Sequence, residues 1–323
     1  MLVPVLLFLL GFVLLIKGGD WFVDGAVGIS RRFHLPELLI GATVVSIGTT
    51  LPEVMVSSQA AAIGNSGISY GNAIGSVICN TSLIAALTAA VRPTSVSRDA
   101  LKLPVAVFFL SAALYALFAY LFGEFSRWMG ILFLCLFVVY LLLTVRQMKA
   151  QPVESSGEEK EDAEVQEPLW KDLLRLLVGA VCIAFGADLL VDNGTLIASA
   201  LGVPDSVIGL TMVALGTSLP ELITAVTSLI KGHNSLSLGN VIGANIFNIL
   251  LVSGMAITIS PFTIPSEKLL FGRNASLVLD IPLMFAVMAI LCLPAVKNGK
   301  LKRWQGILLL GIYAAFTVFQ FVH

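Results

Sequence analysis

Long apolar runs recur along the whole chain, each about as long as a helix that crosses a membrane. A spanning helix needs roughly 20 mostly apolar residues. Ten such runs can be marked: residues 2–23, 36–62, 70–91, 101–122, 128–146, 171–191, 205–230, 236–260, 275–295 and 303–321. Hydrophobic residues make up 57% of the chain and charged residues 12%, against about 25% charged in a soluble domain. The runs are continuous rather than alternating, which favours helices over a barrel. The sequence predicts an all-α polytopic membrane protein with ten transmembrane helices in the lipid bilayer.

Lysine and arginine are unevenly divided between the two sides of these runs. Of the 19 basic residues, fifteen fall on one side and three on the other, and Lys17 lies within the first run. Because basic loops remain in the cytoplasm, both termini are expected outside and the central loop is expected to be cytoplasmic. We expect a multi-pass protein of the plasma (inner) membrane.

The chain matches itself when it is shifted by 168 residues (46 onto 214). SIGTTLPE (46–53) then falls on ALGTSLPE (214–221), and GNAIGSVICN (71–80) falls on GNVIGANIFN (239–248). Agreement at so many polar and glycine positions indicates an internal duplication. Each half holds five runs, an odd number, so the second half should enter the membrane in the opposite orientation. Inverted repeats are typical of transporters whose site lies near the bilayer midplane.

Three regions follow from this register. They are a first five-helix repeat (1–147, the first half), an acidic cytoplasmic linker (148–170) and a second, inverted five-helix repeat (171–323, the second half). The stretch QPVESSGEEKEDAEVQEP (151–168) carries seven acidic residues and one lysine. That composition is typical of a solvated linker, and a calcium-sensing loop is the alternative.

Each half places one glutamate in the middle of an apolar run. Glu53 follows Pro52 and Glu221 follows Pro220, with no lysine or arginine nearby in the sequence. A carboxylate at the bilayer centre is costly, so it should face a cavity and serve a function. Since burial disfavours the charged form, each group either carries a proton or is paired with a cation from solution.

Oxygen atoms are the ligands available beside these glutamates. Proline has no N–H, so the carbonyls of Gly48 and Gly216 lose their helical partner, and a broken helix is expected at the centre of each half. The neighbouring side-chain oxygens belong to Thr49, Thr50, Thr217, Ser218, Asn80 and Asn248. Oxygen ligands suit Ca²⁺, Mg²⁺ or Na⁺, and a dry cage favours Ca²⁺ because Mg²⁺ sheds water reluctantly. Interhelical hydrogen bonding is the alternative role of the two asparagines.

Charge balance then suggests a mechanism. Two carboxylates are neutralised by one Ca²⁺ or by two Na⁺, so a site that holds either ion, but not both, obliges exchange. A channel would need a continuous pore, and an enzyme would need a nucleophile with a base or a metal cluster. We therefore expect a transporter that is no enzyme and has no cofactor, no nucleic-acid partner and no obligate protein partner.

These motifs resemble the cation/calcium exchanger superfamily, and within it the bacterial sodium/calcium exchangers, over essentially the whole chain. The resemblance implies a secondary active antiporter that exchanges Na⁺ for Ca²⁺ by alternating access. It implies that Glu53 and Glu221 hold Ca²⁺, with backbone carbonyls at Thr49 and Thr217 and the side chains of Thr50 and Ser218. It also implies flanking sodium sites, for which Ser76 and Asn80 match in the first half.

The second half departs from the family pattern. It has Ala244 and Asn248 where the family has serine and aspartate. Because Ala244 lacks the hydroxyl of the family's serine, the number of sodium sites stays open. Ca²⁺/H⁺ exchange and K⁺-dependent exchange with the same two glutamates are the alternatives.

Overall fold

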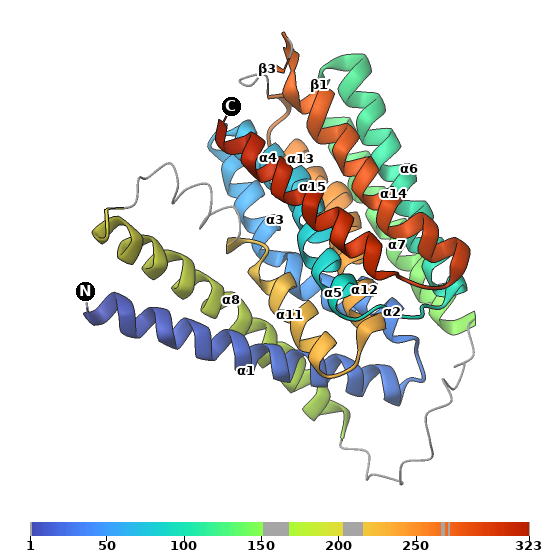
Figure 1. Cartoon of the computed structure of the whole chain (residues 1–323). Coiled ribbons are helices and arrows are strands. Elements are labelled where there is room, and N and C mark those ends of the chain that lie inside the picture. The colour runs from blue at the N-terminus through green and yellow to red at the C-terminus, as the bar shows by residue number, and fades with distance from the viewer. Residues whose placement is uncertain (1, 151–167, 203–215, 266–268, 271, 323) are drawn as a thin grey trace.

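The computed structural model describes residues 2–150, 168–202, 216–265, 269–270 and 272–322, and most of them are helical (Figure 1). In the first half the elements, with η for a π-helical segment, are α1 (Leu2–Arg32), α2 (Glu37–Ile40), η1 (Gly41–Val45), α3 (Ser46–Ala62), α4 (Ser66–Cys79), η2 (Asn80–Ala85), α5 (Ala86–Val91), α6 (Arg98–Phe122), β1 (Glu124–Phe125) and α7 (Arg127–Ala150). In the remainder they are α8 (Leu169–Ala200), α11 (Leu219–Ile230), α12 (Asn234–Phe247), η4 (Asn248–Val252), α13 (Ser253–Ile259), β2 (Phe262–Thr263), β3 (Leu269–Leu270), β4 (Arg273–Asn274), η5 (Ser276–Asp280), α14 (Ile281–Asn298) and α15 (Arg303–Val322). The short strands pair antiparallel, β1 with β2 and β3 with β4.

Eight helical segments of the described chain are long and apolar enough to cross a membrane. They correspond to the first six expected runs and to the eighth and ninth. The seventh run, 205–230, lies partly outside the described residues, and its described part includes the short helix α11. The tenth run forms α15, a helix of 20 residues that is not among the eight. The prediction of an all-α, multi-pass membrane protein is confirmed.

Irregular turns interrupt several of these helices, but not all at the expected places. The helix α3 continues through Pro52, so the expected break is wrong at this proline. A membrane helix tolerates proline where its neighbours satisfy the freed backbone groups. In the second half α11 begins at Leu219, with Pro220 in the first turn, a position that suits proline because no helical N–H is needed there. The π-helical segments η2 and η4 begin at Asn80 and Asn248, which the repeat brings into register.

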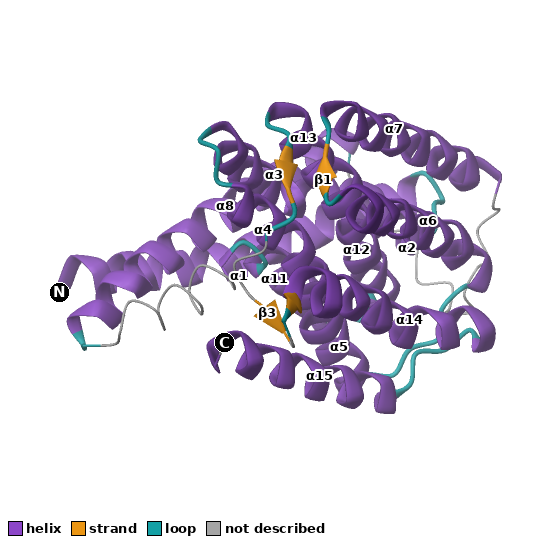
Figure 2. Cartoon of the chain, turned by 90° about the horizontal axis from the view of Figure 1, so that it is seen from above, coloured by secondary structure: helices purple, strands orange, loops and turns teal. Residues whose placement is uncertain are grey.

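The helices α1 and α8 lie side by side along their length (Figures 1 and 2). Glycines allow this approach. A Cβ on Gly11 would lie 2.8 Å from the carbonyl oxygen of Gly186, and one on Gly18 would lie 3.0 Å from that of Gly179. The 168-residue shift takes Gly11 to Gly179 and Gly18 to Gly186. Each contact is therefore the repeat equivalent of the other.

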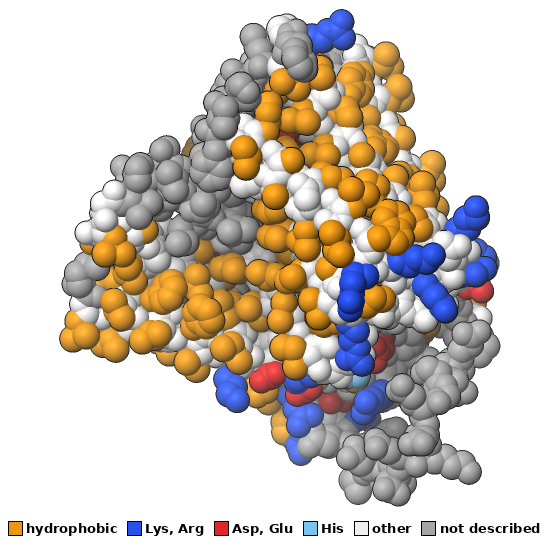
Figure 3. Space-filling model, in the orientation of Figure 1, with side chains coloured by type: hydrophobic (Ala, Val, Ile, Leu, Met, Phe, Trp, Pro, Cys, Tyr) orange, Lys and Arg blue, Asp and Glu red, His pale blue; other side chains and the backbone are white. Residues whose placement is uncertain are grey.

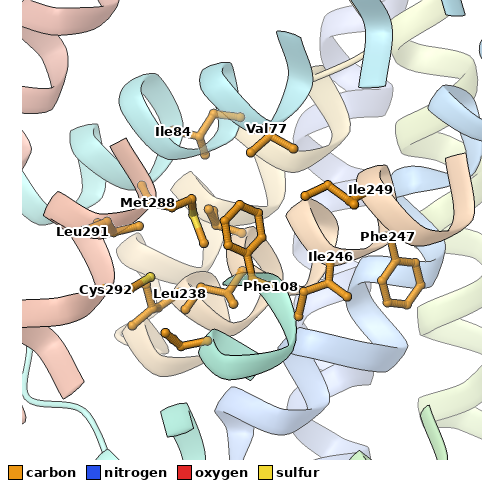
Figure 4. Packing of buried hydrophobic residues seen from close by; sticks show 14 of the residues in the cluster. Val77, Ile84, Phe108, Leu238, Ile246, Phe247, Ile249, Met288, Leu291 and Cys292 are labelled. Atoms are coloured by element: carbon orange, nitrogen blue, oxygen red, sulfur yellow. The ribbon is translucent and has the colours of Figure 1, made fainter. Parts of the chain in front are cut away.

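The apolar core lies where α6, α12 and α14 meet (Figure 4). Phe108, Ile246 and Met288 come from these three helices and are fully buried. Lipid surrounds apolar groups as favourably as protein does, so membrane helices associate through close packing rather than through exclusion of water. This packing fixes α12 beside the helices that carry the polar centre.

Charged side chains gather toward one end of the visible face, and hydrophobic side chains cover much of the rest (Figure 3). Ion pairs join the ends of several helices. Lys231 Nζ lies 2.7 Å from Asp24 Oδ1 and 3.4 Å from Asp20 Oδ1. Arg32 Nε lies 3.5 Å from Asp172 Oδ2. These pairs link α1 to the loop after α11 and to the start of α8.

Candidate cation site

The helix α3 carries the polar centre of the first half. Glu53 is 0% exposed, and Thr49 and Thr50 are buried as well. The two threonines precede Glu53 by four and three residues, so the three side chains share one face of the helix. The helix thus presents a carboxylate and two hydroxyls together inside the protein.

The start of α11 carries the polar centre of the second half. Glu221 is 0% exposed and lies in the first turn, directly after Pro220. A carboxylate at a helix N-terminus is stabilised by the unpaired N–H groups and the helix dipole. Ser218 is buried just before the helix, and Thr217 beside it is half-buried. The hydroxyl of Ser218 has no hydrogen-bond partner among the described residues.

The two centres meet across the halves. Thr50 Oγ1 donates a hydrogen bond of 3.4 Å to Glu221 Oε1. Since Thr50 shares one face of α3 with Glu53, this bond brings the Glu221 carboxylate next to the face that carries Glu53. A narrow crevice beside them is lined by Phe22, Gly48, Thr49, Pro52, Ala180, Ile183, Ala184 and Pro220. The α1–α8 pair therefore covers one side of the site.

The other expected ligands lie on the helices that pack beside α3. Ser76 on α4 is buried, and Asn80 and Asn248 are both fully buried where their π-helical segments begin. Within the described residues, neither amide oxygen nor amide nitrogen of Asn80 and Asn248 makes a hydrogen bond. A π-helical turn often marks a functional site because it shifts side chains and frees backbone groups. Among the described residues, none of these three side chains forms a hydrogen bond with either glutamate.

Each half has two glycines four residues apart, Gly71 and Gly75 in the first and Gly239 and Gly243 in the second. A Cβ on Gly243 would lie 2.6 Å from Ala42 Cα, and one on Gly239 would overlap the Leu38 carbonyl. The second pair therefore lets α12 approach the first half closely. No described atom lies within 4 Å of the Cβ position of Gly71 or Gly75, so the described residues show no such approach there.

Two asparagines outside the predicted site residues bond to α3, the helix that carries Glu53. Asn72 Nδ2 donates to the backbone oxygen of Glu53 at 3.1 Å. Asn240 Oδ1 accepts from Ser46 Oγ and from Thr49 Oγ1, each at 3.2 Å. The signal was present, because the repeat places Asn72 and Asn240 in register within the two GN dipeptides.

No basic side chain of the described residues forms an ion pair with Glu53 or Glu221. Both carboxylate oxygens of Glu53, and Oε2 of Glu221, have no hydrogen-bond partner in the described part of the chain. Buried carboxylates in this condition suit a cation. Two such groups, one from each half of a multi-pass chain and linked through the Thr50–Glu221 bond, are typical of membrane cation transporters.

Comparison with known proteins gives the family. The model of the sodium/calcium exchanger protein family matches residues 3–146 and 171–322. The sodium/calcium exchanger MaX1 of Methanosarcina acetivorans is 33% identical over 351 residues, which cover 98% of each chain. The inner membrane protein YrbG of Escherichia coli is 36% identical over 294 residues, or 89% of each chain. A structure of the sodium-calcium exchanger NCX_Mj soaked with Na⁺ and Sr²⁺ is 35% identical, with a TM-score of 0.80 and coverage of 97% of each chain.

The chain belongs to the sodium/calcium exchanger family. It is a membrane transporter of the antiporter type and not an enzyme. The resemblance read from the duplicated motifs is confirmed. Calcium and sodium enter its chemistry as transported substrates rather than as cofactors.

Proposed function

We propose that this chain exchanges Na⁺ for Ca²⁺ across the plasma membrane by alternating access, as a secondary active antiporter. The observation that carries the proposal is that Glu53 and Glu221, both fully buried and linked through the Thr50–Glu221 bond, have no basic partner among the described residues. Two negative charges at one place accept one Ca²⁺ or two Na⁺. Occupancy by one cargo excludes the other, which couples their movements in opposite directions.

The proposed cage combines both halves. Glu53 and Glu221 bind Ca²⁺ between them, assisted by oxygens of Thr49, Thr50, Thr217 and Ser218, while Ser76, Asn80 and Asn248 serve flanking sodium positions. Carboxylate, hydroxyl and amide oxygens are the ligands that these hard cations prefer. The bond from Thr50 Oγ1 to Glu221 Oε1 supports a cage shared by α3 and α11.

The proposed architecture has ten spans as two inverted repeats, 1–147 and 171–323, joined by an acidic cytoplasmic linker at 148–170. Both termini lie outside, because most basic loop residues fall on the opposite side. The reciprocal contacts of Gly11 with Gly186 and of Gly18 with Gly179 support the two-fold relation. The transporter works in the lipid bilayer without an obligate protein partner.

Proteoliposomes test the exchange directly. Purified protein is reconstituted into vesicles loaded with Na⁺, and uptake of radiolabelled Ca²⁺ is measured after dilution into Na⁺-free buffer. We expect uptake that requires the outward Na⁺ gradient. Vesicles loaded instead with K⁺, or carrying only a pH gradient, should take up little Ca²⁺.

The matched controls are Glu53→Gln and Glu221→Gln, which keep the side-chain shape and remove the charge. Both should abolish uptake. Uptake driven by a pH gradient in wild-type vesicles, with Na⁺ irrelevant, would replace sodium by protons as the coupling ion. Uptake that depends on K⁺ together with Na⁺ would indicate the potassium-dependent alternative.

A further inference from the structure

Three buried hydroxyls on the α11–α12 hairpin take no part in the contacts described so far. Thr224 and Ser228 lie on α11 and Ser237 lies near the start of α12, and all three are buried. Their hydroxyl oxygens have no hydrogen-bond partner among the described residues. Burying a hydroxyl without a partner is costly, so their retention requires an explanation.

Two of the three hydroxyls share a helix face with Glu221, and the third lies on the helix packed against it. Thr224 and Ser228 follow Glu221 by three and seven residues, which places all three on one side of α11. The face rises about 10 Å along the helix from Glu221 toward Lys231. Ser237 lies on α12, which follows a connection of residues 231–233 and packs against α11. The hydroxyls therefore extend from the carboxylate to the end of α11 where Lys231 pairs with α1.

The first half shows that the fold does not need hydroxyls at two of these positions; the third, Ser237, is matched by Ser69, whose hydroxyl donates to the backbone oxygen of Ser57 at 2.8 Å. The 168-residue shift places Val56 on Thr224 and Ala60 on Ser228. The hydroxyl of the first half belongs to Ser57 instead, and it accepts a 2.8 Å hydrogen bond from Asn72 Nδ2. The first half thus has the apolar side chains of Val56 and Ala60 at the two equivalent positions. The second half instead has the hydroxyls of Thr224 and Ser228, which have no hydrogen-bond partner among the described residues.

We infer that Thr224, Ser228 and Ser237 form a track of neutral oxygen ligands along which Na⁺ moves between Glu221 and the Lys231 end of α11. The inference rests on the proposed Na⁺/Ca²⁺ exchange and adds a route for one of its cargoes. A monovalent ion can exchange part of its water for hydroxyl oxygens. Ca²⁺ carries twice the charge and takes carboxylates among its ligands, and these three residues supply none.

The test uses the double variant Thr224→Val/Ser228→Ala, which copies residues 56 and 60 of the first half. Two rates are measured in proteoliposomes: Na⁺-driven Ca²⁺ uptake as a function of internal Na⁺, and exchange of labelled for unlabelled Ca²⁺ without Na⁺. We expect the Na⁺ concentration for half-maximal uptake to rise about fivefold or more, the order expected for each lost oxygen contact. The rate of Ca²⁺/Ca²⁺ exchange should stay close to that of the wild type. Ser237→Ala should shift the Na⁺ dependence in the same direction by a smaller factor.

Thr144→Val is the matched control. Thr144 is buried, but its hydroxyl donates to the backbone oxygen of Tyr140 at 2.9 Å, on α7, so both rates should be unchanged. An equal loss of both rates in the double variant would assign the hydroxyls to the shape of the Glu221 site and overturn the track. An unchanged Na⁺ dependence would overturn it as well. The proposed function is tested separately, by the wild-type protein. If the wild type shows no Na⁺-driven Ca²⁺ uptake, both sodium exchange and the track are overturned.

Discussion

The two halves of the molecule carry the same glutamate but surround it differently. In the first half Asn72 bonds within its own repeat, to the Glu53 backbone and to Ser57. Its counterpart Asn240 bonds across the repeat boundary, to Ser46 and Thr49. The duplication has therefore kept the two buried carboxylates, while the residues that support them have diverged.

The same divergence appears in the secondary structure. The first glutamate lies within a helix that is continuous through Pro52, whereas the second lies in the first turn of a helix that starts beside Pro220. Glu221 is consequently stabilised by a helix N-terminus and by Thr50, while both oxygens of Glu53 are unpaired among the described residues. Protein contacts therefore hold the Glu221 carboxylate, whereas the carboxylate oxygens of Glu53 make no hydrogen bond among the described residues.

The largest effect is expected when either glutamate loses its charge. Removing one partner of a buried charged group costs about 3–5 kcal/mol, or a hundredfold or more in affinity. Glu53→Gln and Glu221→Gln should each reduce Ca²⁺ uptake by at least about a hundredfold, when measured at sub-saturating Ca²⁺ and equal protein density. A variant that keeps a tenth of the wild-type uptake would show that the two halves do not share the cargo equally.

The next effect concerns the tight approach of α12 to the first half. Gly243→Ala would place a methyl group 2.6 Å from Ala42 Cα and against the Ser46 hydroxyl. Overpacking of this kind costs about 1–3 kcal/mol, so the thermal unfolding temperature in detergent should fall. Gly67→Ala is the control, because its nearest described atom would be Asn65 Oδ1 at 3.7 Å. Equal melting of the two variants would mean that α12 can shift without cost.

The sequence alone predicted the features of the fold and of the site that depend on composition and on the internal repeat. Hydropathy located eight helices, and the repeat located Glu53 and Glu221. The continuity of α3 at Pro52 was missed, because neighbouring helices decide whether a proline breaks a membrane helix. The role of Asn240 was missed too, since a buried asparagine bonds to whichever partner the tertiary packing supplies, here Ser46 and Thr49.

A smaller effect should follow from exchanging the residues that differ at the equivalent positions 76 and 244. Under the proposed function Ser76 supplies a sodium ligand that Ala244 lacks. Ser76→Ala should raise the half-saturating Na⁺ concentration about fivefold, the order of one lost oxygen contact. Ala244→Ser should lower it, when both are measured by Na⁺-driven Ca²⁺ uptake. A fall for Ser76→Ala together with a rise for Ala244→Ser would show that a hydroxyl at this position does not serve as a sodium ligand.

The ends of the two halves also differ in charge. The 168-residue shift brings two acidic residues of α1 into register with two of α8: Asp20 with Asp188, and Asp24 with Asp192. The basic residue does not recur, because Ile63 stands at the position equivalent to Lys231. An ion-pair link between α1 and the loop after α11 is therefore a feature of one end of the molecule, within the described residues.

Lys231→Ile, which copies the other half, should have the smallest effect. The side chains of Lys231 and Asp24 are 25% and 50% exposed, and exposed ion pairs contribute only about 0–1 kcal/mol. The variant should melt slightly below the wild type at low salt. The difference should close in 1 M salt, where charges are screened beyond about 3 Å. A difference that persists in high salt would show that Lys231 acts through the packing of its aliphatic stem, and the two ends would then differ in shape rather than in charge.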